Sequence, residues 1–171
     1  MVTPAIRAAT VDDTEALARL WVAARSARRV EAGLEGEAER SEALAKARAD
    51  VSERLDDDMI GAVAEDADGL VAMAIAVPAR ADDGAGPERL PGVLHVSLVA
   101  VHPDRWGQGL AEIVLGSVLN AARRQGYTAS QLWTQESNAR GRRLYERMGW
   151  APSGRAKVQD GEGILHYELS L

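Results

Sequence analysis

Two glycines at the start of a helical segment are the residues whose type and spacing point most directly to chemistry. A strand-like run over 93–101 ends at His102-Pro103, and Gly107-Gln108-Gly109 then leads into a long helical pattern. The first turn of a helix has about four amides without partners and about half a positive charge, so it attracts anions such as pyrophosphate. Glycine lets the backbone approach such a ligand closely. An anion site is one interpretation of these glycines, and a tight turn between strand and helix is the other.

Two well-known phosphate motifs do not fit this segment. A P-loop requires G-x-x-x-x-G-K followed by Ser or Thr, and the sequence contains no such run. The dinucleotide-binding motif G-x-G-x-x-G would need a glycine at the position of Glu112. Both motifs are therefore excluded as the explanation of the glycine turn.

A second candidate group lies on the helical segment 138–148. Asn138 and Tyr145 are seven residues apart, which is two turns of a helix, so both side chains can reach one ligand from the same side. A tyrosine on an apolar helix face more often packs in a core than binds a ligand. The residues by themselves leave both interpretations open.

Together, the two segments resemble motifs of the GNAT superfamily of acyl-CoA-dependent N-acyltransferases. Residues 106–111 read Trp-Gly-Gln-Gly-Leu-Ala and are similar to the pattern Q/R-x-x-G-x-G/A, with Trp106 in place of Gln or Arg. Residues 138–150 are similar to the pattern N-x-x-A-x-x-L-Y-x-x-x-G-F, with Gly141 for alanine and Trp150 for phenylalanine. The resemblance extends over nearly the whole chain and is strongest over 93–150.

The resemblance implies that acetyl-CoA is the co-substrate. Backbone amides after the glycine turn would hold its pyrophosphate, and the strand main chain would hold pantetheine, with the amide at or near Val99 facing the thioester oxygen. Tyr145 would face the sulfur, and a hydrogen bond is its expected role because full proton transfer from a phenol to a thiolate is uphill by about 2 kcal/mol. The CoA-binding residues implied in this way are Val99, Val101, Trp106, Gly107, Gln108, Gly109, Leu110, Ala111, Asn138 and Tyr145.

His95 is the candidate general base. An alkylammonium near pKa 10.4 is protonated at neutral pH, so a proton must leave before or during attack on the thioester. The resemblance places His95 where many relatives carry a glutamate, and strand alternation puts His95, Ser97 and Val99 on one face if no bulge intervenes. Ordered water is the alternative base.

Four arginines give the segment 138–148 a basic character in an acidic protein. One of them could bind the 3′-phosphate of CoA. A solvated helix face that pairs with Glu136 and Glu146 is the alternative. These arginines are Arg140, Arg142, Arg143 and Arg147.

Composition limits the classes of partner. The 171 residues include 20 Lys and Arg, 26 Asp and Glu and no cysteine, which gives a formal net charge of −6. A negative protein repels phosphate backbones, and the lack of cysteine excludes disulfides, thiol catalysis and cysteine-ligated zinc. The three histidines are scattered and form no metal motif, and no apolar run approaches the roughly 20 residues of a membrane span. We expect a cytoplasmic protein without metal, nucleic acid or membrane partners.

Apolar periodicity predicts one α/β domain over residues 1–171, with a mixed sheet of about seven strands flanked by about four helices. The GNAT resemblance implies that this central sheet is mostly antiparallel. Strands are expected at 6–9, 59–64, 70–77, 93–101, 130–135, from 150 onwards and at 164–171. Helices are expected after 10–13, over 35–55, after Gly109 with Leu110, Ile113, Val114 and Val118 buried, and over 138–148. Residues 79–92 are rich in Gly, Pro and acids, which is typical of a mobile surface loop.

The sequence as a whole predicts an N-acetyltransferase. It would move an acetyl group from acetyl-CoA to a primary amine of a small molecule by direct attack in a ternary complex. A lysine side chain or a protein N-terminus is the alternative acceptor, and a non-catalytic acyl-CoA-binding module, a sensor or an assembly part, is the alternative function. The terminal strands could pair across a two-fold axis to form a homodimer.

Overall fold

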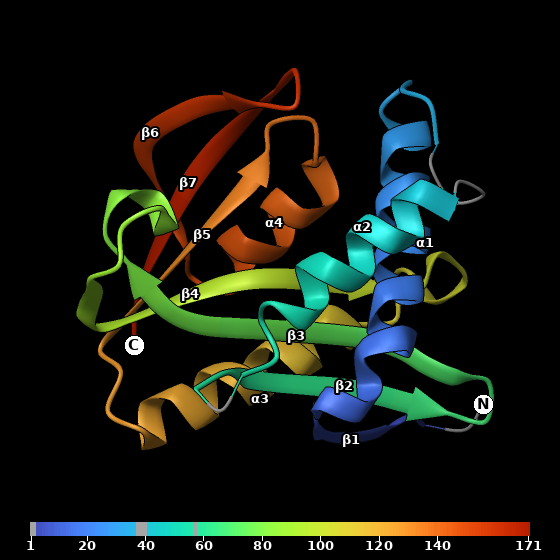
Figure 1. Cartoon of the computed structure of the whole chain (residues 1–171), viewed down its shortest axis with the longest axis horizontal. Helices are drawn as coiled ribbons and strands as arrows, with labels where there is room; N and C mark the ends of the chain where they lie inside the picture. Colours follow the sequence, from blue (N-terminus) through green and yellow to red (C-terminus); the bar gives the residue numbers. More distant parts are fainter. Residues whose placement is uncertain (1–2, 37–40, 57) are drawn as a thin grey trace.

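Within residues 3–36, 41–56 and 58–171, which the computed structural model describes, seven strands form one sheet in the order β1-β2-β3-β4-β5-β7-β6 (Figure 1). The strands are β1 (Ala5–Ala8), β2 (Ile60–Asp66), β3 (Gly69–Arg80), β4 (Arg89–Val101), β5 (Ala129–Gln135), β6 (Ala151–Gln159) and β7 (Glu162–Ser170). The helices are α1 (Thr14–Glu31), α2 (Ser41–Ser52), α3 (Leu110–Arg124) and α4 (Ala139–Arg147), with short 3-10 turns η1 (Val11–Asp13), η2 (Asp82–Gly84) and η3 (Pro103–Arg105).

The sheet is mixed, as the sequence predicts. Every neighbouring pair of strands is antiparallel except β4 and β5, which are parallel and joined by the crossover helix α3. Two buried apolar clusters lie on the two faces of the sheet: α1 and α2 cover one cluster, and α3 and α4 cover the other (Figure 1). The predicted fold class is confirmed.

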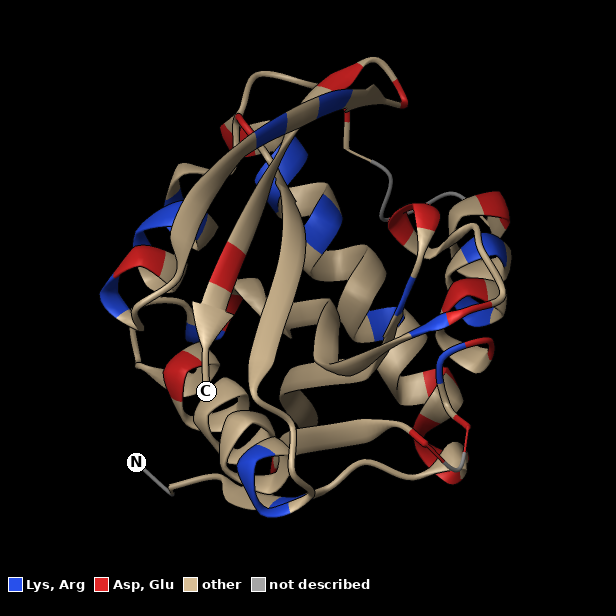
Figure 2. Cartoon of the chain, turned by 90° about the vertical axis from the view of Figure 1, so that its left-hand side faces the viewer, with Lys and Arg blue, Asp and Glu red and all other residues tan. Residues whose placement is uncertain are grey.

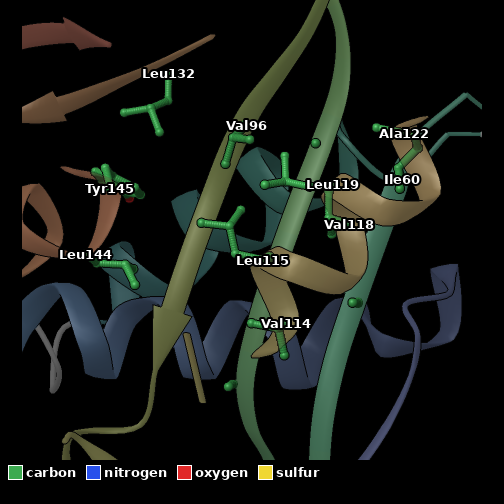
Figure 3. Close-up of a cluster of buried hydrophobic side chains, with 14 of the residues drawn as sticks. Ile60, Val96, Val114, Leu115, Val118, Leu119, Ala122, Leu132, Leu144 and Tyr145 are labelled. Carbon is green, nitrogen blue, oxygen red and sulfur yellow. The ribbon is translucent and has the colours of Figure 1, made fainter. Parts of the chain in front are cut away.

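Helix α3 packs on the sheet through a stripe that the sequence predicts only in part. Leu110, Val114 and Val118 are buried, as expected, whereas Ile113 is 47 % exposed. The second row of the stripe is formed by Leu115 and Leu119, which Figure 3 shows on the same side of the helix as Val114 and Val118. Ile113 precedes this double row by one residue, or about 100° around the helix, and therefore faces solvent.

The segment 79–92 is not one long loop. β3 continues to Arg80 and β4 begins at Arg89, and these two residues pair across the ladder. The predicted loop is wrong at both ends because pairing with the neighbouring strand extends residues whose composition favours turns. The connection is a hairpin over 81–88, in which Asp82 and Asp83 have positive φ angles of 51° and 55°.

The second helix is shorter than predicted. It covers Ser41–Ser52, so the predicted helical residues Glu35 and Gly36 lie outside it, and residues 37–40 are outside the described part of the chain. The other expected elements are present, with boundaries that differ by up to a few residues. No helix of the described residues combines the length and the apolar character that crossing a membrane requires.

A β-bulge in β4 determines the shape of the site. Leu98 and Val96 oppose the consecutive residues Ile75 and Ala76 of β3, so Ser97 is an extra residue in the ladder. On its other side, β4 pairs with β5 only over Val93–Val96. Beyond the bulge the two strands separate, and β4 has an edge that no strand covers.

Candidate active site

A cleft of about 980 Å³ opens where β4 and β5 separate. Its walls are the end of β4, the start of α3, the inner side of α4, and side chains from α1, α2, β6 and β7. All the predicted site residues except Gln108 line this cleft. The structure therefore brings together residues from segments 95–111 and 138–145.

The start of α3 forms one wall of the cleft. Gly109 is the N-cap with φ 76°, and Gly107 has φ 79°, a region that residues with a side chain rarely adopt. An added Cβ would meet no atom within 4 Å at either glycine, so the backbone conformation is the reason for glycine here. Leu110 and Ala111 follow in the first turn, where the backbone amides have no partner within the helix.

The open edge of β4 presents main-chain groups to the same cleft. The amide of His102 donates to the carbonyl of Val71 on β3 at 2.8 Å. Because successive peptide groups in a strand point to opposite edges, the amides and carbonyls of Val101 and Val99 point away from β3. Beyond Val96 no ladder with β5 covers that edge, so the amide of Val99 faces the cleft as a hydrogen-bond donor.

Trp106 connects the glycine turn to both neighbouring elements. Its indole Nε1 donates to the carbonyl of Val101 at 2.9 Å, so this carbonyl is already engaged. The guanidinium of Arg140 on α4 lies 4.5 Å from the centroid of the Trp106 ring and also pairs with Glu31 of α1 at 2.9 Å. The position at which relatives carry Gln or Arg thus gains a positive charge from a neighbouring helix.

Asn138 has a structural role at the start of α4. Its Oδ1 accepts a hydrogen bond from the amide of Gly141 at 3.1 Å, and its Nδ2 donates to Thr134 at 3.2 Å. A Cβ on residue 141 would lie 2.4 Å from the Asn138 Nδ2 atom, which explains why glycine replaces alanine in the motif. Asn138 lines the cleft, but both ends of its amide already have partners within the protein.

Tyr145 presents a phenol to the cleft without a competing partner. The side chain is buried, with 7 % of its surface exposed, and its ring packs edge-on against Trp150 at 5.9 Å. Burial raises the pKa of Tyr145 to about 12. Its hydroxyl has no hydrogen-bond partner among the described residues. The group is therefore a neutral donor at physiological pH.

His95 lines the cleft, but strand alternation predicts its neighbours incorrectly. Arg54 donates to the hydroxyl of Ser97 on the α2 side of the sheet, whereas Val99 packs in the α3 cluster. The expected common face of His95, Ser97 and Val99 depended on the absence of a bulge. The bulge at Ser97 turns the strand, so Val99 faces the opposite side of the sheet.

The chemistry of His95 is set by its surroundings. Burial, and next the charge of Arg54, lower the pKa of His95 to about 4. Its Nδ1 atom is buried and has no partner among the described residues. A neutral imidazole of such low pKa accepts a proton from an ammonium of pKa 10.4 only at a cost of about 9 kcal/mol, so it is a weak base for this step.

The four arginines of α4 separate into different roles. Arg142 binds the hydroxyl of Tyr167 and does not line the cleft, and Arg147 pairs with Glu112 of α3. Arg143 lines the cleft, and no partner for it is found in the described part of the chain. Arg143 and Arg140 are therefore the cations of α4 best placed to meet an anion.

The other histidines lie outside the cleft. His102 caps η3, and His166 is buried between Ser153 and Gln131 with its ring against Trp133. Within residues 3–36, 41–56 and 58–171, no group of three or more His, Asp or Glu side chains could hold a metal ion.

Sequence reasoning missed three further residues at the end of the cleft that contains His95. These are Arg54, Trp133 and Lys157, from the turn after α2, from β5 and from β6. They belong to no local motif, and only the packing of separate elements brings them together.

Comparisons with known proteins agree with this architecture. Residues 16–150 match the family model described as the acetyltransferase (GNAT) family. No curated protein matches the chain. The PaiA N-acetyltransferase from Thermoplasma acidophilum, solved in complex with coenzyme A, superimposes with a TM-score of 0.72 at 11 % identity, covering 98 % of this chain and 100 % of the other.

Two further solved structures share the fold. The ribosomal-protein-S18-alanine N-acetyltransferase from Escherichia coli has a TM-score of 0.69 at 16 % identity, covering 97 % of this chain and 92 % of the other. The ribosomal-protein-alanine N-acetyltransferase from Brucella melitensis has a TM-score of 0.71 at 20 % identity, covering 98 % of this chain and 99 % of the other. At these identities the structural matches show a common fold.

Proposed function

Because this chain belongs to the GNAT acetyltransferase family, we propose that it is an acetyl-CoA-dependent N-acetyltransferase acting on a primary amine of a small molecule by direct attack in a ternary complex. The observation that carries the proposal is the meeting of three groups in one cleft. They are the open edge of β4, the first turn of α3 and the phenol of Tyr145.

The residues present fit acetyl-CoA. The first turn of α3 offers unpaired amides and positive potential to the diphosphate. Among the described residues, the cleft is lined by ten Lys and Arg and by six Asp and Glu, although the whole chain has a net charge of −6. Bound acetyl-CoA supplies an acetyl group activated as a thioester. Arg140 and Arg143 are the side chains of α4 that would add charge to its phosphates.

Two groups of the chain serve the transfer itself. As the amine nitrogen bonds to the carbonyl carbon and the carbon–sulfur bond breaks, the amide of Val99 donates to the oxygen that gains charge. The Tyr145 hydroxyl donates to the departing sulfur. With a phenol pKa of about 12, Tyr145 retains its proton, because transfer to a thiolate near pKa 8.5 would cost about 5 kcal/mol.

The amine must also lose a proton, and His95 is poorly suited to take it. Its pKa of about 4 favours a hydrogen-bonding role toward the acceptor, with the proton leaving to solvent. The acceptor therefore enters the reaction as the free amine or loses its proton to water.

A peptide N-terminus is the second candidate acceptor. The observation that favours it is the fold shared with an Escherichia coli enzyme named for an alanine of ribosomal protein S18. A small molecule remains the proposed acceptor, and the test below distinguishes it from a peptide N-terminus.

The test combines binding and turnover. Calorimetry should detect CoA binding, and free thiol should appear when acetyl-CoA is mixed with amino acids, polyamines, aminoglycosides or short peptides. Thiol release with a peptide alone would move the proposal to the second acceptor. CoA binding without release on any amine would support a non-catalytic module, and absence of CoA binding would overturn the proposal.

A further inference from the structure

The charge of the cleft extends beyond the part that CoA would occupy. Besides Arg140 and Arg143 near α3, cations line the opposite end beside His95, on the turn after α2 and on β6. Figure 2 shows the blue stretches of β6 on the hairpin at the top of the view. A phosphate ligand at the start of α3 does not account for positive charge at this distant end.

Arg54 is one of the two cations of this end whose charge acts on His95. Its side chain is 31 % exposed, and its guanidinium donates to Ser97 Oγ and to the carbonyl of Asp50. Within the described residues, the carboxylate that pairs with it is Glu53, at 4.0 Å and with 81 % of its side chain exposed. A partly buried guanidinium with so distant and solvated a partner retains capacity for an anion.

Lys157 and Trp133 lie next to each other at the same end. The Lys157 ammonium is 4.4 Å from the centroid of the Trp133 ring, and Lys157 has no carboxylate partner in the described part of the chain. The indole Nε1 of Trp133 is buried and has no hydrogen-bond acceptor among the same residues. A buried donor without a partner destabilises the fold, and a ligand that supplied an acceptor would remove this penalty.

Two acidic side chains of this region already form ion pairs with arginines other than Arg54. Glu162 binds both Arg28 and Arg29, and Asp83 binds Arg155. Asp50 and Asp160 also line the cleft and can meet the positively charged nitrogen of an amine. Arg54, Lys157 and the Trp133 indole have donors and no acceptors, and the charges of Arg54 and Lys157 both act on His95, so a group bound to them there would supply acceptor oxygens.

A second cavity of about 620 Å³ reaches the same point from the side of the 81–88 hairpin. Its lining shares Arg54, Asp83, His95 and Ser97 with the main cleft. These four residues form a common wall between the two cavities, so the end of the main cleft beside His95 is hollowed on both sides of that wall.

We propose that the acceptor amine carries a carboxylate, and that Arg54 and Lys157 bind this carboxylate beside His95 with a hydrogen bond from the Trp133 indole. The proposal rests on the proposed acetyltransferase function and names its substrate class. The net charge of −6 would by itself favour cationic amines, whereas the local cations at this end of the cleft favour a carboxylate. The carboxylate could belong to a free amino acid or to an acidic peptide.

The first experiment compares matched acceptors on the protein saturated with acetyl-CoA. Glycine, β-alanine and γ-aminobutyrate are each paired with their carboxamides, and glutamyl-alanine is paired with glutaminyl-alanine for the peptide source. Spermidine and an aminoglycoside represent cationic acceptors. The expected result is a kcat/KM at least tenfold higher for the carboxylate member of the preferred pair. Equal values, or preference for a carboxamide or a cationic amine, overturn the inference.

The second experiment changes the residues. Lys157→Glu should raise KM for the carboxylate acceptor at least tenfold and leave KM for its carboxamide within twofold. Arg54→Gln should have the same selective effect, with CoA affinity within twofold of the parent. The control is Arg123→Gln on the exposed last turn of α3, which should leave both KM values unchanged. A uniform change in both KM values would contradict the assignment.

Binding measurements separate the two proposals. With CoA bound, calorimetry should detect the carboxylate amine and not its carboxamide, whether or not thiol is released. Binding of carboxylate amines without acetyl transfer would overturn the enzyme function and keep the carboxylate site. Acetyl transfer without a preference for carboxylates would keep the enzyme function and overturn the carboxylate site. Absence of binding by every carboxylate amine would also overturn the inference.

Discussion

The two ends of the cleft are built from different parts of the polypeptide. At the α3 end, the groups proposed to bind a ligand are main-chain amides of the contiguous segment 99–111, next to α4. At the α2 end, the proposed groups are the side chains of Arg54, Trp133 and Lys157, which come from three separate elements spread over about a hundred residues of the chain. The first end suits a ligand that is the same throughout a family, whereas the second end can change with single substitutions.

This difference explains where the motifs lie. Main-chain amides need a particular backbone conformation, and that conformation requires glycine or a capping residue at fixed positions. Side-chain recognition needs only that a charge reach the site, and several elements can supply it. The α3 end therefore leaves a local signature in the sequence and the α2 end leaves none.

The largest expected effect is at the α3 end. Gly109→Val forces a β-branched residue into the left-handed region, so the first turn of α3 would reorient. Loss of even one or two charge-assisted hydrogen bonds of about 1.5–3 kcal/mol predicts roughly 100-fold weaker CoA binding by calorimetry.

Gly126→Val is the matched control for this change. Gly126 has φ 88° beyond the other end of α3 and does not line the cleft. It should lower the free energy of unfolding by about 1–3 kcal/mol and leave CoA affinity unchanged. Unchanged CoA affinity in Gly109→Val would place the diphosphate elsewhere.

A smaller effect, on kcat, is expected when the hydroxyl of Tyr145 at the α3 end is removed. Tyr145→Phe removes the donor to sulfur and should lower kcat about 30-fold in steady-state assays, with CoA affinity within twofold. Tyr167→Phe is the control, because the Tyr167 hydroxyl binds Arg142 and Glu146 outside the cleft. A kcat equal to that of the parent in Tyr145→Phe would remove this hydroxyl from the mechanism.

The smallest expected effect concerns stability at the α2 end. Unfolded His95 binds a proton near its ordinary pKa of 6.5, and folded His95 only near 4, so the unfolded state gains protons first as the pH falls. Lowering the pH from 7 to 5.5 should therefore cost about 1 kcal/mol of folding free energy through His95. In His95→Gln, urea titrations at pH 7 and 5.5 should show a loss of folding free energy that is smaller by this amount.

The other two histidines supply a control and account for the acid sensitivity of stability that His95→Gln should retain. His102→Gln, on an exposed turn, should retain the acid sensitivity of the parent. Burial also lowers the pKa of His166, so part of the sensitivity should persist in His95→Gln. An unchanged loss of stability in His95→Gln would show that His95 titrates normally in the folded protein.

Much of the α3 end could be predicted from the sequence. The turn at Gly107 and Gly109, the start of α3 and the placement of Asn138 and Tyr145 on one helix all depend on neighbouring residues. The roles of these residues toward CoA remain predictions. The errors in the fold, the segment 79–92 and the exposure of Ile113, arose where ladder pairing or the orientation of a helix decided the outcome.

The sequence by itself determined the order of elements, the helix start that can bind an anion and the family motifs, because local backbone conformation depends on residues adjacent in the chain. Only the tertiary structure decided the bulge at Ser97, the low pKa of His95 and the placement of Arg54, Trp133 and Lys157 on one cleft. Strand register, burial and contacts across about a hundred residues come from packing, and packing depends on the whole chain at once.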